Sequence, residues 1–74
     1  MIKELDPVVL TKALPEHGLQ AGDVGWVVMV HAGGSGYEVE FLTLNGETVS
    51  VETLAADSVR EAQHKEIAHA RRVA

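Results

Sequence analysis

The sequence contains no cysteine, only three aromatic residues and no long apolar run. The absence of cysteine excludes disulfide bonds, thiol catalysis and thiolate metal sites, and it favours a reducing compartment, which we expect to be the cytoplasm. The first residues lack the basic and apolar regions of a signal peptide, and no run approaches the length of a membrane span. We therefore expect a protein that is neither exported nor embedded in a membrane.

Basic side chains are also scarce, with six lysines and arginines against eleven acids. Residues 1–57 carry nine acidic and two basic side chains, whereas residues 58–74 carry two acidic and four basic ones. Because an acidic body repels phosphate backbones, binding to nucleic acid would depend on the short basic end alone. The charge distribution counts against a nucleic-acid partner.

What is present is enough for one folded domain, which we place over residues 1–74. The composition, 46% hydrophobic and 23% charged, is typical of a globular protein. A chain of this length buries only about 60% of the surface that it exposes when unfolded, so its stability margin is narrow. Small size therefore favours a binding or scaffolding role over a deep catalytic cavity.

Runs of β-branched and apolar residues predict four strands, separated by stretches that are rich in glycine and proline. One run is apolar on both faces, as a strand bent across a barrel would be, and is expected to be central. Another two alternate with a period of two and form a hairpin. The predicted strands cover residues 6–11, 24–31, 37–41 and 47–53, with a long loop at 12–23 and a turn at 32–36.

The hairpin turn can be tested against the hydrophobic pattern. A two-residue Asn45-Gly46 turn would place Phe41 opposite Ser50, and core residues opposite polar ones throughout. A three-residue loop, Leu44-Asn45-Gly46, instead pairs Phe41 with Val49 and Val39 with Val51, and puts Gly46 in the left-handed region. We predict this second register. It turns Tyr37, Val39, Phe41, Val49 and Val51 inward, and leaves Glu38, Glu40 and Glu52 outside, with Glu38 roughly opposite Glu52.

Two structures remain open for residues 61–74. The segment Ser58-Val59-Arg60-Glu61 matches a helix capping box, but the apolar residues that follow make only a weak helical stripe. The alternative is one helical turn over residues 57–60 and then a last strand over residues 66–72. Periodicity alone does not decide between the two structures.

The order of strand, long loop, Gly22-Asp23-Val24-Gly25, hairpin and terminal strand is similar to the SH3-like barrel plan. Five segments also resemble a family of short bacterial SH3-like-barrel proteins catalogued as a domain of unknown function (DUF): residues 2–6, 14–19, 21–25, 37–41 and 45–48. The resemblance implies an all-β SH3-like barrel of about five strands, with a short helical turn before a terminal strand. It brings no catalytic residues and no ligand. A weaker likeness, through residues 22–25, is to KOW-type domains, which contact RNA or protein.

No motif indicates catalysis, a metal or a cofactor. None of the four histidines, His17, His31, His64 and His69, stands at the i, i+4 spacing of a helical metal-binding pair, and no thiols complete a set. The glycine-rich residues 32–36 lack the following helix that a phosphate loop needs, so they are expected to connect two strands. We therefore predict that the protein is not an enzyme and has no cofactor.

Trp26 is the only tryptophan, and two interpretations of it stay open. A core position is favoured, because a small barrel has few large groups to fill it. The alternative is a half-exposed position at a partner groove, where aromatic residues often form binding hot spots. Quenching of its fluorescence by a small polar quencher distinguishes the two positions.

We predict a non-enzymatic protein–protein interaction module whose partner is another protein or a second copy of the chain. In the second case, the basic end of one subunit would meet the acidic face of the other. The alternative is a KOW-like nucleic-acid-associated module that uses Arg60, Lys65, Arg71 and Arg72 against phosphates. The candidate interaction surface is Trp26, Glu38, Glu40, Glu52, Arg60, Arg71 and Arg72.

Overall fold

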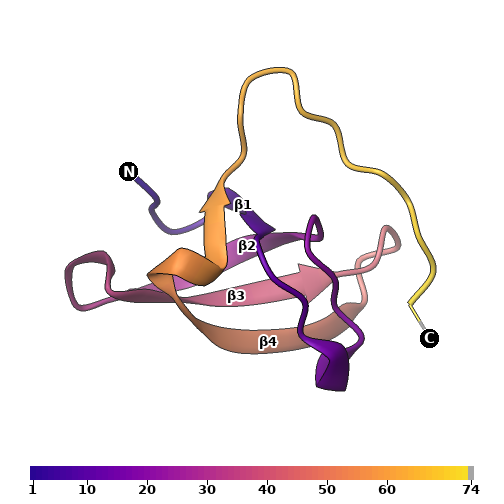
Figure 1. Ribbon diagram of the computed structural model, residues 1–74, viewed down its shortest axis with the longest axis horizontal. Coiled ribbons are helices and arrows are strands. Elements are labelled where there is room, and N and C mark those ends of the chain that lie inside the picture. Colours follow the sequence, from indigo (N-terminus) through magenta and orange to yellow (C-terminus); the bar gives the residue numbers. More distant parts are fainter. Residues whose placement is uncertain (74) are drawn as a thin grey trace.

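The computed structural model describes residues 1–73 and shows an all-β protein (Figure 1). Its five strands form one antiparallel sheet in the order β4-β3-β2-β1-β5. Within the described residues, no helix is long and apolar enough to cross a bilayer. The strands are β1 (Pro7–Leu10), β2 (Val24–His31), β3 (Gly36–Leu42), β4 (Thr48–Ala55) and β5 (Val59–Glu61), and the 3-10 turns are η1 (Pro15–His17), η2 (Ala32–Gly34) and η3 (Ala56–Ser58).

This architecture confirms the predicted fold class, with five strands and a helical turn before the last one. The sheet curls, and β5 runs steeply across the direction of β3 and β4 (Figure 1). The curl encloses a core formed by alternate residues of the strands, together with one leucine of the 12–23 loop. The buried cluster consists of Val8, Leu10, Leu19, Val27, Tyr37, Val39, Phe41, Leu54 and Val59.

Gly25 allows the core to close against β2. A Cβ atom at this position would lie 2.9 Å from Cε1 of Phe41 and in still closer contact with Cγ1 of Val39. Both side chains are almost fully buried and cannot move aside without leaving the core. The chain therefore needs glycine here because the backbone of β2 must approach the side chains of β3.

The loop of the β3–β4 hairpin is as predicted. The Thr43 N–H donates to the Glu47 carbonyl at 2.8 Å, and the Gly46 N–H donates to the Thr43 carbonyl at 2.9 Å. Gly46 has a φ of 87°, in the left-handed region that glycine tolerates. Residues Leu44, Asn45 and Gly46 thus connect the strands.

The predicted register beyond this loop is wrong. Leu42 lies opposite Thr48, but Phe41 lies opposite Ser50, so that β4 contributes one additional residue, Val49, between these pairs. Such a bulge shifts every later pair by one residue and turns the following side chains to the other face. Val49 still packs against the core.

Two expected orientations and one expected residue pair are wrong as a consequence of the bulge. Val39 lies opposite Glu52 instead of Val51, so Glu52 is on the core side of β4 and not on the outside. Val51 lies opposite Glu40 and is 49% exposed, although it was expected to face inward. Glu38 lies opposite Thr53, so the expected like-charge pair of Glu38 and Glu52 does not form.

Neither structure that was expected for residues 61–74 forms in the described part of that segment, which ends at residue 73. Ser58 is the last residue of η3 and caps no helix. The last strand is β5, whose three residues pair with residues 8–10 of β1. These pairs occupy the edge of β1 as far as its last residue, and residues 66–72 form no strand.

Candidate interaction surface

We define the outer face as the side of β2, β3 and β4 that points away from the core. Four apolar side chains lie on it, each between 42% and 49% exposed: Trp26, Val28, Met29 and Val51. Glu40 lies between Trp26 and Val51, because it is paired with Trp26 on β2 and with Val51 on β4. Glu38 is paired with Met29 in the next row. The outer face therefore carries two glutamates on its middle strand and apolar groups on both sides of them.

The favoured interpretation of Trp26 as a core residue is wrong. Trp26 is 44% exposed and is absent from the buried cluster. Side chains alternate along a strand, and the inward positions on either side of Trp26 are taken by Gly25 and Val27. The signal was present in the sequence, because an inward Gly25 places Trp26 on the opposite face.

A second bulge enriches the outer face in apolar groups. On β2, Val27 pairs with Val39 and Met29 pairs with Glu38, so Val28 is an additional residue between them. Val28 and Met29 are both exposed as a result. The bulge explains why the central strand is apolar on both faces although only one face packs on the core.

Side chains of the neighbouring strands lie close to both glutamates of the outer face, and one of them donates a hydrogen bond to Glu40. The Thr48 hydroxyl donates to Oε2 of Glu40 at 2.7 Å. Nε2 of His31 lies 3.2 Å from Oε2 of Glu38, although the angles are not those of a hydrogen bond. Both carboxylates are partly buried. Glu40 is thus positioned by a hydrogen bond before any partner arrives, whereas Glu38 has only the neighbouring imidazole of His31 beside it.

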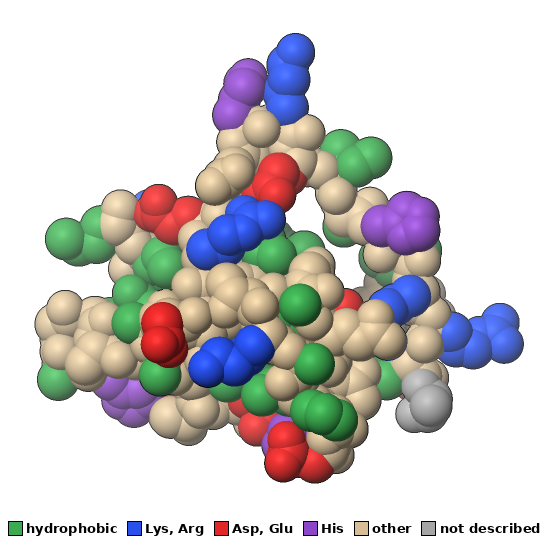
Figure 2. All heavy atoms as spheres, in the orientation of Figure 1, with side chains coloured by type: hydrophobic (Ala, Val, Ile, Leu, Met, Phe, Trp, Pro, Cys, Tyr) green, Lys and Arg blue, Asp and Glu red, His purple; other side chains and the backbone are tan. Residues whose placement is uncertain are grey.

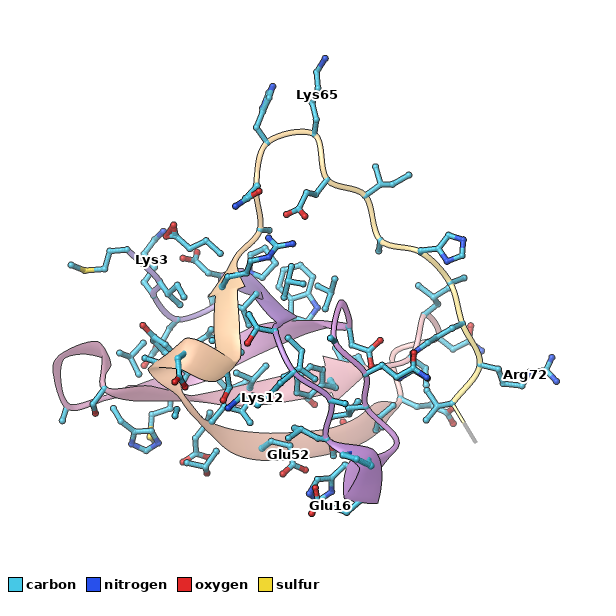
Figure 3. All side chains as sticks on the ribbon, in the orientation of Figure 1. Lys3, Lys12, Glu16, Glu52, Lys65 and Arg72 are labelled. Atoms are coloured by element: carbon cyan, nitrogen blue, oxygen red, sulfur yellow. The ribbon has the colours of Figure 1, made fainter. Side chains whose placement is uncertain are left out.

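Glu52 is not part of this surface. On the core side of β4, its Oε1 lies 3.2 Å from Nε2 of His17 in η1, and its side chain is only 17% exposed. Figure 3 shows Glu52 beside η1, on the side where Glu16 also lies. The structure therefore separates Glu52 from Glu38 and Glu40.

The basic end is occupied mainly by contacts within the chain. Arg60 binds Glu66 with two hydrogen bonds, from Nη1 to Oε1 at 2.9 Å and from Nη2 to Oε2 at 2.7 Å. This guanidinium lowers the pKa of Glu66 to about 2, helped by the N–H of Gln63. Arg71 binds both carboxylate oxygens of Asp23 and lowers the pKa of that carboxyl.

Of the four basic side chains between residues 58 and 73, Lys65 and Arg72 remain outside such pairs. Lys65 stands at the top of the C-terminal arch, and Arg72 points away from the body (Figure 3). The structure does not bring Arg60, Arg71 or Arg72 to Glu38 and Glu40 of the same chain. Neutralisation of Arg60 and Arg71 also counts against a nucleic-acid surface at this end.

The histidines are dispersed. His17 of η1 lies beside Glu52 of β4, and His31 of β2 lies beside Glu38 of β3 on the opposite face of the sheet. Across residues 1–73, no three histidine, aspartate or glutamate side chains are grouped closely enough to hold a metal ion.

The fold and this surface define a small all-β domain with an open, partly apolar outer face. The chain belongs to the family described as "Domain of unknown function (DUF4926)", whose model matches residues 4–61. No curated protein and no solved structure matches the chain. The matched residues include all five strands and end where the last strand ends.

Proposed function

We propose that this domain is a non-enzymatic, cytoplasmic protein-interaction module that docks through its outer face. The observation that carries the proposal is the group of four half-exposed apolar side chains, Trp26, Val28, Met29 and Val51, around the acidic row of Glu38 and Glu40. Scattered apolar side chains are common on protein surfaces, but contiguous groups often mark interaction sites. Tryptophan in particular is enriched among residues that dominate binding energy.

The arrangement also defines the partner's chemistry. Glu38 and Glu40 favour a lysine or arginine at the centre of the docked surface, whereas Trp26 and Val51 favour apolar groups around it. Because strand pairing already holds these side chains, docking loses little conformational freedom on this side. The partner is another protein or a second copy of the chain. In a second copy, Lys65 and Arg72 are the basic residues of the C-terminal end that lie outside the ion pairs of the described residues and could reach the acidic row.

A single substitution tests the outer face. In Val51→Lys, an exposed apolar group becomes a cation opposite Glu40, which a sheet tolerates as an opposite-charge pair. The variant should keep its fold but lose affinity for its partner by about tenfold or more, because it removes an apolar contact and neutralises the acidic row. The measurement is affinity capture from native lysate with parent and variant, followed by quantitative mass spectrometry.

The matched control is Ala13→Lys, which adds the same charge at an exposed position of the 12–23 loop, away from the outer face. It should capture the same protein as the parent chain. Sedimentation of the purified chain tells a second copy from a different partner. A protein that is captured equally well by parent and Val51→Lys, or a chain that is monomeric and captures nothing specific, contradicts the proposal.

A further inference from the structure

The residues after β5 form a strap that touches the body of the protein at few points. Residues 62–72 are all exposed, and within residues 1–73 none of their backbone groups is hydrogen-bonded to the sheet. Figure 1 shows this segment arching away from the strands and returning near the 12–23 loop, and Figure 2 shows an opening beneath the arch. The return is secured by Arg71, with Val73 lying against Gly18.

The guanidinium of Arg71 binds three acceptor atoms of the 12–23 loop. Its Nε donates to Oδ1 of Asp23 at 2.9 Å, and its Nη2 donates to Oδ2 of Asp23 and to the Gly18 carbonyl at 2.8 Å. A planar guanidinium satisfies all three acceptors at once, whereas the ammonium of a lysine is a point charge without this fork. The geometry of the site therefore selects arginine.

Hydrogen bonds within the 12–23 loop, and not the strap, hold the carboxylate of Asp23 and the turn around it in position. The Gln20 N–H donates to Oδ2 of Asp23 at 2.8 Å, and the Asp23 N–H donates to the Gln20 carbonyl at 3.0 Å. The Gly22 N–H donates to the Leu10 carbonyl at 2.7 Å and ties this turn to β1. The site is thus already shaped for an arginine from any source.

The strap is a weak occupant of this site. Two partly exposed ion pairs hold it: Arg60–Glu66 near its start and Arg71–Asp23 at its returning end, the latter with one small apolar contact. Only the second pair occupies this site, and such pairs contribute little against the freedom that the segment loses. Gly18 and Asp23 lie inside the residues matched by the family model, whereas Arg71 lies outside them. The acceptors therefore belong to the family domain, and the arginine that fills them here belongs to an extension of it.

Space for a longer ligand lies next to Arg71. A groove of about 880 Å³ runs between the strap and the β3–β4 hairpin, with Leu42, Leu44 and Val49 on its apolar side and Trp26 at its border. Leu44 is 90% exposed, so no other part of residues 1–73 covers its side chain. The strap forms one side of the groove and leaves its apolar side open.

We propose that Asp23 and Gly18 form an arginine-binding site for an extended segment of a partner protein, and that the strap is a tethered competitor for it. The segment carries one arginine for the three acceptors and neighbouring aliphatic side chains for the groove. The acidic residues that predominate in the body attract such a basic segment. The three acceptor atoms lie apart from the pairing rows of the outer face, although the groove shares Trp26 with that face. The proposal does not depend on the proposed function, because its test reads binding at residues 18–23.

The test uses the full chain and a peptide with the sequence of residues 66–73 as the probe. In Arg71→Ala, the tethered competitor is removed, so the peptide should bind about fivefold more tightly than it binds the parent. Replacement of the arginine corresponding to Arg71 by lysine in the peptide should weaken binding about tenfold, because the fork is lost. Isothermal titration gives the affinities, and amide shifts at Gly18, Gln20 and Asp23 locate the bound peptide.

Adding Asp23→Asn to Arg71→Ala should abolish binding, with circular dichroism as the check on folding. If that double variant does not fold, the amide shifts in Arg71→Ala still decide, because they must centre on residues 18–23. Equal affinity for parent and Arg71→Ala, equal binding of the lysine peptide, shifts elsewhere, or no binding at about millimolar peptide overturns the proposal. A parent dimer that Arg71→Ala converts to monomers also overturns it, because the occupant is then the strap of a second copy.

Discussion

Neighbouring residues of β2 have opposite roles, and a single glycine determines which is which. Gly25 faces the core and makes room for Val39 and Phe41, so the large side chain of Trp26 must point outward. The only tryptophan of the chain is therefore available on the surface, while the core is filled mainly by valine and leucine. The inward position of Gly25, which has no side chain, thus places Trp26, the candidate binding residue, on the outer face.

Gly25→Ala should destabilise the protein. The added methyl group would lie 2.9 Å from Cε1 of Phe41 and closer still to Val39, and overpacking of this kind costs about 1–3 kcal/mol. Urea unfolding of parent and variant gives the difference in free energy of unfolding. A variant as stable as the parent would mean that β2 does not approach β3 in this way.

The Arg60–Glu66 pair should be visible in acid titration. The pKa of Glu66 is about 2, well below its ordinary value, chiefly because Arg60 donates two hydrogen bonds to the carboxylate. Because the folded pKa is depressed, the pair persists as the pH falls below the ordinary glutamate range and is lost near pH 2.

Arg60→Ala should raise the pKa of Glu66, although the remaining hydrogen bond from Gln63 keeps it below that of a free glutamate. Titration of the side-chain carboxyl resonance by NMR measures both values. A Glu66 that titrates alike in parent and Arg60→Ala would mean that the pair is absent in solution.

At the scale of elements, two bulges account for what sequence patterning missed. Composition and alternation correctly predict the strand over residues 24–31 and the hairpin loop. They also predict the inward positions of Tyr37, Val39 and Phe41. Each bulge adds one residue to one strand, and the period-two pattern carries no sign of it. The bulge at Val49 moves Glu52 to the core side and Val51 to the outer face, so the candidate surface could be predicted only in part.

Residues 61–73 show a different limit. Their apolar residues fit a helix and a strand equally poorly, and the outcome depends on a long-range contact, the pairing of Arg71 with Asp23. That contact joins positions 48 residues apart. No local pattern encodes it, whereas the structure shows it directly.

Engineered disulfides can establish the β3–β4 register, because the chain has no cysteine of its own. Glu38→Cys with Thr53→Cys should oxidise to an intramolecular disulfide, since these residues lie directly opposite each other on the outer face. Glu38→Cys with Glu52→Cys should not, because the bulge turns residue 52 to the core side. Thiol counting after mild oxidation is the measurement, and a reversal of the two results would restore the register without the bulge.

At the scale of the whole molecule, the side beneath the strap and the outer face of the sheet differ in how much of the chain covers them. β5 leads into the strap, and the strap returns to the 12–23 loop, so this side of the molecule is partly covered by the chain itself. The outer face of β2, β3 and β4 has its acidic row and four apolar groups exposed. The proposed docking surface is therefore the open outer face, whereas the proposed arginine site lies where the strap returns to the 12–23 loop.

Fluorescence of Trp26 tests this central claim most directly, because no other tryptophan contributes to the signal. In the folded, free protein, acrylamide should quench the emission strongly, as expected for a side chain that is 44% exposed. In the complex with the captured partner, quenching should fall, since the outer face is then covered. Weak quenching in the free protein, or strong quenching that the partner leaves unchanged, would contradict the account.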